Sequence, residues 1–322
     1  MVLTVTLNPL LENRLHFDSV QVGALNRSSQ QEFKAGGKGI NVSRQLNFLG
    51  IQNIALTFLG GNNGKILRRL LVEENINFSA IPTKMETRGA ILAVEAGTQR
   101  LTTLFEPNCA IIKNEADEFK SKLEKMIRNC STVIFSGSSP CSETDEIFSQ
   151  GIALANQLDK TSILDTYGNP LKSAIEASPT ILHNNISEIE TSLSLDLSSE
   201  KNVIAFFKDV YKKGVKLAFL TNGKRATYAS KFDFIYRIEQ SKIVEVDPTG
   251  SGDAFVAGIA LGLENGIVFD EFVKTASALG AANASKWGVC NSNFEEIEGH
   301  IKNITVTSIG KKAKLIDDSP TH

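Results

Sequence analysis

Cysteine is scarce in this chain, and its few copies lie far apart. Among the 322 residues are four cysteines, none with the close spacing of metal ligands: Cys109, Cys130, Cys141 and Cys290. A chain of this length can bury a sizeable core without disulfides. A structural zinc site or a secreted disulfide framework is therefore not expected, and a reducing compartment fits better.

Long hydrophobic runs and a strong charge of either sign are also absent. No window approaches the roughly 18 apolar residues of a membrane span, and the first residues lack the basic and apolar regions of a signal peptide. The formal net charge is −2, so no overall positive field attracts nucleic acid. These absences predict a cytoplasmic protein without nucleic-acid or membrane partners, in which any anion binds at a local pocket.

Short apolar runs alternate with segments of helical period along most of the chain. Residues 53–58 are followed by 64–74, residues 162–164 by 171–177, and long helices are expected from 251 to 286. Strands that alternate with helices predict a parallel sheet covered on both faces. We expect one α/β domain over residues 1–322, with a mostly parallel central sheet.

Two segments, residues 12–34 and 77–105, interrupt this alternation because they read as strands with little helix between them. Such pieces can assemble into a small antiparallel sheet beside the main one. A lid over a cleft is the natural use of that sheet. The alternative is a pair of ordinary edge hairpins.

The run Asp-Pro-Thr-Gly-Ser-Gly-Asp at residues 247–253 carries the clearest chemical signal. It stands between a strand-like run at 242–246 and a helix expected at 254–263. Pro248 cannot continue a strand ladder, so the chain must turn there. The alternative reading is a flexible loop that ends in a helix-capping aspartate.

The residues that follow this turn suit an anion. Gly250 and Gly252 allow the backbone to approach a ligand closely, and the N–H groups of the helix start favour negative charge. Asp253 then lies where the hydroxyl of a phosphoryl acceptor would arrive, which suits a general base. Residues 60–65 have neither the spacing nor the Ser/Thr of a Walker loop.

The run at 247–253 resembles the C-terminal signature of the ribokinase-like, PfkB-type carbohydrate kinases. The N-terminal signature of that family is also present, at residues 35–43. Further segments are similar to the branch with 1-phosphofructokinase and tagatose-6-phosphate kinase: 6–9, 23–27, Lys38 in Gly-Gly-Lys-Gly, 60–64, 87–88, 136–140 and 220–223. The resemblance covers nearly the whole chain.

The resemblance implies a ribokinase-like α/β fold with a β-sheet lid, and ATP and magnesium as cofactors. It implies phosphorylation of a ketohexose monophosphate, of the fructose 1-phosphate or tagatose 6-phosphate type, to the bisphosphate. Lids of this family often serve in dimerisation, so a homodimer through the lid is the partner to consider. An unphosphorylated sugar or nucleoside remains an alternative acceptor, and a non-catalytic sugar-phosphate or nucleotide sensor is an alternative function.

The resemblance also assigns roles to single residues. Asp253 would be the base, with Gly250, Ser251 and Gly252 stabilising the transferred phosphoryl group. The acceptor site would comprise Glu12, Gly37, Asn41 and Ser138, with Lys38, Arg27 and Arg88 as cations for its phosphate and Arg44 as a weaker candidate. The nucleotide side would comprise Asn185, Thr221, Gly223, Lys224, Gly252 and Asn283, although Asn283 could equally be a packing residue in mid-helix. Glu188 and Asn185 would hold magnesium through water.

The sequence departs from the family pattern at several positions, which leaves the exact substrate open. Glu12 stands where an aspartate is usual, and His183-Asn184 where the family has Lys-Pro, so we expect His183 to be structural. Ala226 and Asn108 replace glycines, and Cys141-Ser142 replaces Pro-Gly. None of these changes removes a residue assigned to phosphoryl transfer.

Overall fold

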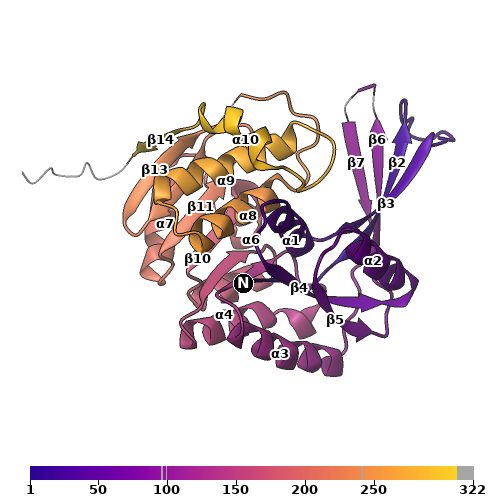
Figure 1. Cartoon of the computed structure of the whole chain (residues 1–322), viewed down its shortest axis with the longest axis horizontal. Coiled ribbons are helices and arrows are strands. Elements are labelled where there is room, and N and C mark those ends of the chain that lie inside the picture. The colour runs from indigo at the N-terminus through magenta and orange to yellow at the C-terminus, as the bar shows by residue number, and fades with distance from the viewer. Residues whose placement is uncertain (96, 99, 241, 310–322) are drawn as a thin grey trace, which may run out of the picture.

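Two β-sheets of unequal size organise the chain in a computed structural model that describes residues 1–95, 97–98, 100–240 and 242–309 (Figure 1). Residues 310–322 of the expected domain lie outside the described part. The larger sheet has ten strands, and those from β11 to β5 run parallel. From edge to edge they are β14 (Thr305–Ser308), β13 (Phe234–Glu239), β12 (Thr227–Lys231), β11 (Leu217–Thr221), β10 (Ile181–Asn185), β9 (Thr161–Asp165), β8 (Thr132–Ser136), β1 (Val2–Thr6), β4 (Asn53–Gly60) and β5 (Phe78–Thr83).

Helices cover both faces of this sheet, as the sequence pattern predicts. All five residues of β1 are buried, because Leu3 and Val5 pack into one core cluster and Val2 into the other. One face carries α3 (Lys113–Arg128), α4 (Ile147–Gln157), α5 (Pro170–Glu176), α6 (Ile186–Leu193) and α7 (Glu200–Lys212), with a short 3₁₀ turn at Ser142–Thr144. The other carries α1 (Lys38–Phe48), α2 (Gly61–Glu73), α8 (Ser251–Glu264), α9 (Phe269–Ala284) and α10 (Phe294–Ile301).

The smaller sheet projects from the body of the molecule beside α2 (Figure 1). It has four strands in the order β3 (Gln30–Gly36), β2 (Leu10–Phe17), β6 (Gly89–Glu95) and β7 (Arg100–Phe105). The sheet is mixed rather than purely antiparallel, because β2 and β6 run parallel. Residues 78–83 were expected in it, but they form β5, which pairs with β4 and completes the edge of the main sheet.

One further expectation about the backbone is wrong. Residues 242–246 form no strand, and Val246 instead donates its N–H to the carbonyl of Ala284 in α9 at 2.8 Å. The neighbouring position in the sheet is taken by β14, which pairs with β13. In the described part of the chain, no helix combines the length and the apolar character needed to cross a bilayer.

Candidate active site

A cavity of about 760 Å³ lies where the carboxyl ends of the parallel strands meet the inner face of the small sheet. Ligand sites of open α/β sheets lie at this edge. Both expected signature segments contribute: Gly37, Lys38 and Asn41 come from the first, and residues 248–253 from the second. The small sheet adds Leu10, Glu12, Leu92, Thr103 and Phe105, so it forms one wall of the cavity as a lid would.

The loop after Asp247 presents the start of α8 to the cavity. Gly250 is the residue before the helix and has φ of +79°, a left-handed conformation that favours glycine. A Cβ there would also collide with Val289. The N–H of Ser251 is used within the turn, where it donates to Pro248 O at 3.1 Å. The next N–H groups, those of Gly252 and Asp253, begin the helix and have no intrahelical acceptor.

Asn283 holds this loop from behind and is not among the residues that line the cavity. Its side chain is fully buried in α9, and its amide nitrogen donates to the Thr249 carbonyl at 2.8 Å and to the Ser251 hydroxyl at 3.1 Å. Its amide oxygen accepts the N–H of Cys290 at 2.7 Å. These contacts favour the alternative of a packing residue in mid-helix, and the expected role of Asn283 at the nucleotide stays a prediction.

Asp253 joins the two signature segments. Its Oδ2 accepts a hydrogen bond of 2.7 Å from Nδ2 of Asn41 in α1. Arg44 donates to Oδ1 of Asn41, also at 2.7 Å, and this contact leaves the Asn41 amide one orientation, with its NH₂ toward Asp253. Arg44 additionally binds Glu74 and the Ala35 carbonyl, so it supports the site and is not a phosphate ligand facing the cavity.

The charge state of Asp253 suits a general base. Burial raises the pKa of this carboxyl to about 7, although the nearby charge of Lys38 opposes the shift. The charge of Asp165 raises the pKa further. A group with this pKa can both take up and release a proton near neutrality.

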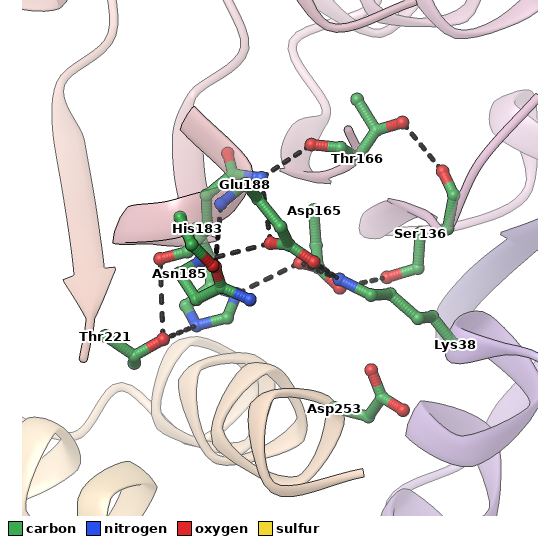
Figure 2. A network of polar contacts seen from close by, with 12 residues as sticks. Lys38, Ser136, Asp165, Thr166, His183, Asn185, Glu188, Thr221 and Asp253 are labelled. Carbon is green, nitrogen blue, oxygen red and sulfur yellow. Dashed lines mark hydrogen bonds and ion pairs between the residues drawn. The ribbon is translucent and has the colours of Figure 1, made fainter. Parts of the chain in front are cut away.

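Lys38 lies between two carboxylates (Figure 2). Its Nζ is 2.8 Å from Oε1 of Glu188 and 3.2 Å from Oδ1 of Asp165, and 5.2 Å from the ring centre of Tyr167. Burial alone would lower the pKa of Lys38, but the charges of Asp165, Glu188 and Asp253 raise it above its ordinary value. An ammonium already matched by two carboxylates has less to offer a phosphate, and its expected role as a phosphate ligand stays a prediction.

Asp165 is the centre of this polar network, and three side chains hold it. Besides Lys38, Nδ1 of His183 lies 3.1 Å from Oδ1, and the Ser136 hydroxyl lies 3.1 Å from Oδ2. Burial would raise the pKa of Asp165, but Lys38 and His183 hold it well below the ordinary value. The His183 ring also stacks on Phe255, with ring centres 5.2 Å apart, and it lines the cavity.

Glu188 and Asn185 form the cap of α6. Oδ1 of Asn185 accepts the N–H of Glu188 at 2.8 Å, and Oε2 of Glu188 accepts the N–H of Asn185 at 3.1 Å. Mg²⁺ prefers oxygen ligands and keeps several waters, with one or two carboxylates nearby. The carboxylate of Glu188 lines the cavity beside Asn185, so these two residues fit a hydrated magnesium ion. Asp165 is fully buried behind them and does not line the cavity.

Arg88 and Ser138 both line the cavity, and their expected roles at the acceptor stay predictions. Arg88 donates to Oδ1 of Asn108 at 3.0 Å, and its guanidinium lies 5.4 Å from the ring centre of Phe105. Burial lowers the pKa of Arg88. No carboxylate within the described ranges forms an ion pair with Arg88, so an anion that enters the cavity would find this cation unmatched.

The remaining site residues divide into two groups. Thr221, Gly223 and Lys224 line the cavity, and Lys224 lies 3.5 Å from Glu245. Arg27, in contrast, is exposed in the loop between β2 and β3 and does not line the cavity. The small sheet carries that loop away from the body of the molecule (Figure 1), so the expectation for Arg27 is not supported within one copy of the chain.

Sequence reasoning missed Asp165, Tyr167 and Asn8, all of which belong to the site or its network. Asn8 lines the cavity and donates to Ser138 Oγ at 3.0 Å. Asp165 had a usable signal, because it is an acidic residue at the carboxyl end of an apolar, parallel strand. Tyr167 follows it by two residues and gave no comparable signal.

Known proteins similar to this chain are sugar kinases. A family model described as pfkB family carbohydrate kinase matches residues 10–296. The chain is 30% identical over 320 residues to a tagatose-6-phosphate kinase from Staphylococcus epidermidis, across 98% of this chain and 100% of the relative. It is 31% identical over 310 residues to a 1-phosphofructokinase from Borreliella burgdorferi, across 96% of this chain and 99% of the relative.

Solved structures share the fold. A Thermotoga maritima protein described as a possible 1-phosphofructokinase superposes with a TM-score of 0.88 at 24% identity, across 96% of this chain and 100% of that one. Phosphofructokinase-2 from Escherichia coli, in complex with fructose-6-phosphate, superposes with a TM-score of 0.83 at 21% identity. The match covers 94% of this chain and 98% of that one. Ribokinase from Thermotoga maritima superposes with a TM-score of 0.73 at 20% identity, across 94% of this chain and 99% of that one. This match confirms the ribokinase-like fold.

Proposed function

The chain belongs to the pfkB family of carbohydrate kinases, and from this premise we propose that it transfers the γ-phosphoryl group of ATP to a ketohexose monophosphate. The printed names of the two relatives at 30% and 31% identity support an acceptor of the tagatose 6-phosphate or fructose 1-phosphate type. The four cysteines are free, which agrees with a cytoplasmic location.

One observation carries the proposal: Asp253 is a buried, hydrogen-bonded carboxyl with a pKa of about 7 at the start of a helix that faces the cavity. Asn41 uses Oδ2, so Oδ1 is the oxygen to receive a proton. As the primary hydroxyl of the acceptor gives its proton to Asp253, its oxygen bonds to the γ-phosphorus. The bond from that phosphorus to the bridging oxygen breaks, and ADP and a bisphosphate leave.

The start of α8 stabilises the charge that develops on the transferred group. The N–H groups of Gly252 and Asp253 and the positive end of the helix dipole favour negative charge at this point. Such donors are fixed before the reaction, so they need no reorganisation when the charge forms.

The cation end of the cavity serves the nucleotide phosphates. Glu188 and Asn185 would hold a hydrated Mg²⁺, with Asp165 close by, and the bound ion would neutralise charge on those phosphates. Lys38 forms ion pairs with both Asp165 and Glu188 and so holds these two carboxylates close together. Thr221, Gly223 and Lys224 line the remainder of the nucleotide side.

Arg88 favours a phosphorylated acceptor over a neutral sugar. Its side chain is half-buried and binds the side-chain amide oxygen of Asn108 and the carbonyl of Asn8, but no carboxylate in the described residues. A phosphate dianion would form charge-assisted hydrogen bonds with it. A neutral acceptor would leave the cost of burying this charge uncompensated.

The lid is proposed to carry a homodimer interface. On its outer face, Phe33, Ile91 and Leu104 lie in one row across the strands, with Asn13 of β2 between Phe33 and Ile91. The three apolar side chains are 39%, 41% and 59% exposed. A row of exposed apolar side chains on a sheet marks a surface for association. Light scattering of the purified chain should give the mass of a dimer, and a monomeric mass would reject this part of the proposal.

ADP release separates the proposed reaction from its rivals. We expect turnover with one of fructose 1-phosphate, tagatose 6-phosphate and fructose 6-phosphate, and little with ribose, fructose or adenosine. Turnover with an unphosphorylated compound only would instead identify the neutral-acceptor kinase. Ligand-induced thermal stabilisation by a sugar phosphate without ADP release from any acceptor would identify a non-catalytic sensor.

A further inference from the structure

A buried arginine in the lid has no part in the reaction described above. Arg14 lies on β2, and its side chain is 5% exposed. Its Nε is 3.2 Å from Oε2 of Glu12, and its NH1 is 3.3 Å from Oδ2 of Asp247. The guanidinium therefore bridges the small sheet and the loop that leads into α8, two segments 233 residues apart in the sequence.

The two carboxylates that Arg14 holds both act on the cavity. Glu12 lines it, and its Oε1 points toward Gly36, where a Cβ would come within 2.8 Å of that oxygen. Asp247 shapes the turn before α8, because its Oδ1 accepts the N–H of Thr249 at 2.9 Å. A displacement of Arg14 would thus alter an acceptor-facing carboxylate and the entrance to the anion site together.

The energetics indicate a geometric role for this cluster. Two buried carboxylates share one guanidinium, and its third nitrogen, NH2, is buried without a partner among the residues that the structure describes. Buried ion clusters of this kind give little net stability, because desolvation offsets the attraction. They do fix orientation, and the planar fork of arginine holds two carboxylates where the single ammonium of lysine cannot.

We propose that Arg14 is a positioning residue that determines acceptor specificity. It holds Glu12 in one orientation against the hydroxyls of the acceptor and sets the position of the small sheet relative to residues 247–250. The inference rests on the proposed function, since it concerns the same acceptor site. Glu12 is the residue that touches the acceptor, and Arg14 acts through it.

The substitution Arg14→Lys tests this role. Tagatose 6-phosphate and fructose 6-phosphate differ only in the configuration of one hydroxyl, so their kcat/KM ratio reports on a fixed hydrogen-bonding group. We expect the KM for the preferred acceptor to rise about tenfold and the ratio to shrink by a similar factor, the worth of about one hydrogen bond to a charged group. The dissociation constant for ADP should stay unchanged. Arg100→Lys is the matched control, because Arg100 pairs with Glu95 in the same sheet but is 65% exposed.

Amide hydrogen exchange is a second test of the role of Arg14, and it does not depend on enzymatic turnover. In Arg14→Lys, amides of β2 and of residues 247–250 should exchange faster together, while those of β9 and β10 should not change. If Arg14→Lys does not fold, Asp247→Asn keeps the acceptor for the Thr249 N–H and removes the charge that Arg14 binds. It should raise exchange in the same two segments.

The outcomes separate this inference from the proposed function. A wild-type chain that phosphorylates none of the acceptors rejects the function, and the exchange measurement still decides the role of Arg14. A folded Arg14→Lys variant with an unchanged acceptor ratio overturns the inference. So does an increase in exchange confined to β2, because Arg14 would then not connect the lid to the loop.

Discussion

Two buried carboxyl groups on opposite sides of Lys38 behave in opposite ways. Asp165 stands at the end of β9, and Asp253 in the first turn of α8 (Figure 2). The pKa of Asp165 is held well below its ordinary value, whereas that of Asp253 is raised to about 7. Burial pushes both upward, so the difference comes from their partners.

The partners explain the roles. Asp165 accepts hydrogen bonds from an ammonium, a histidine ring and a hydroxyl, and it stays charged. Asp253 accepts one hydrogen bond, from the neutral amide of Asn41. The nearby carboxylates of Asp165 and Glu188 repel a negative charge on Asp253 and so raise its pKa. Acid–base assignments in active sites follow from such divergent environments. Asp165 is thus a fixed charge that organises Lys38 and His183, and Asp253 is the group able to exchange a proton.

The largest expected effect comes from Asp253→Asn, which would remove the base and keep the shape. Turnover should fall by about 10²–10⁴-fold, the usual contribution of a positioned base. ADP binding should remain, because the N–H groups at the start of α8 are backbone groups. The measurement is single-turnover ADP formation at saturating substrates.

The same assay on Asp165→Asn could break the comparison. That variant leaves Lys38 and His183 without their central partner, so we expect a loss of stability first and a smaller loss of turnover. If folded Asp165→Asn loses as much turnover as Asp253→Asn, the two carboxyl groups do not have separate roles.

The sequence predicted Asp253 but missed Asp165. The place of Asp165 at the end of an apolar strand was a usable signal for a site residue, but its part in the polar network depends on contacts of long range. The function of Asp253 depends on a local feature, the glycine-rich turn into a helix, which is visible in seven consecutive residues. That of Asp165 depends on Ser136, His183 and Lys38, which three other segments bring to it. Local patterns carry no information on which distant side chains will meet.

The same limit applies to the fold. The alternation of strands and helices predicted the parallel sheet and both helical layers, because each element buries its own apolar face. It did not predict that residues 78–83 join the main sheet. These residues could pair either with β4 or with a strand of the small sheet, and the local pattern does not distinguish the two partners. Nor did it predict Arg14, whose partners are two residues and 233 residues away.

A second prediction uses stability instead of turnover. Asp253 binds its proton with a pKa of about 7 when folded and near the ordinary 3.8 when unfolded. Between these values the folded state binds more protons, so the free energy of unfolding should fall as pH rises from about 4 to about 7. A shift of about three units corresponds to at most about 4 kcal/mol. Asp253→Asn should abolish this contribution.

Urea unfolding across that pH range measures the effect. The contribution of Asp165 has the opposite sign and a different window, since its depressed pKa gives stability that is lost only below the ordinary value. Asp117→Asn, at an exposed carboxylate of α3, is the control and should follow the wild type. Equal pH slopes for wild type and Asp253→Asn would contradict the raised pKa.

The smallest effect, and the one that sharpens the comparison most, is expected for Lys38→Met. The charge of Lys38 lowers the pKa of both Asp165 and Asp253. Its loss should therefore move the acidic limb of the pH–kcat profile to higher pH, because more of the base is then protonated at neutrality. Loss of a hydrogen bond between charged groups, about 1.5–3 kcal/mol, corresponds to about a ten- to hundredfold decrease in kcat/KM.

The distribution of that loss decides what Lys38 binds. If it contacts the phosphate of the acceptor, as the sequence predicts, the KM for the phosphorylated ketose should rise and discrimination against the unphosphorylated sugar should shrink. If Lys38 instead acts through its ion pairs with Asp165 and Glu188, as the structure favours, the KM for the acceptor should change little. The main effect should then be the shift of the acidic limb of the pH–kcat profile. Lys213→Met is the matched control, because Lys213 also bridges two carboxylates, Glu176 and Asp209, at 3.0 and 3.1 Å. It caps the C-terminal end of α7 and does not line the cavity. An unshifted limb together with an unchanged acceptor KM would show that Lys38 does not distinguish the two carboxyl groups.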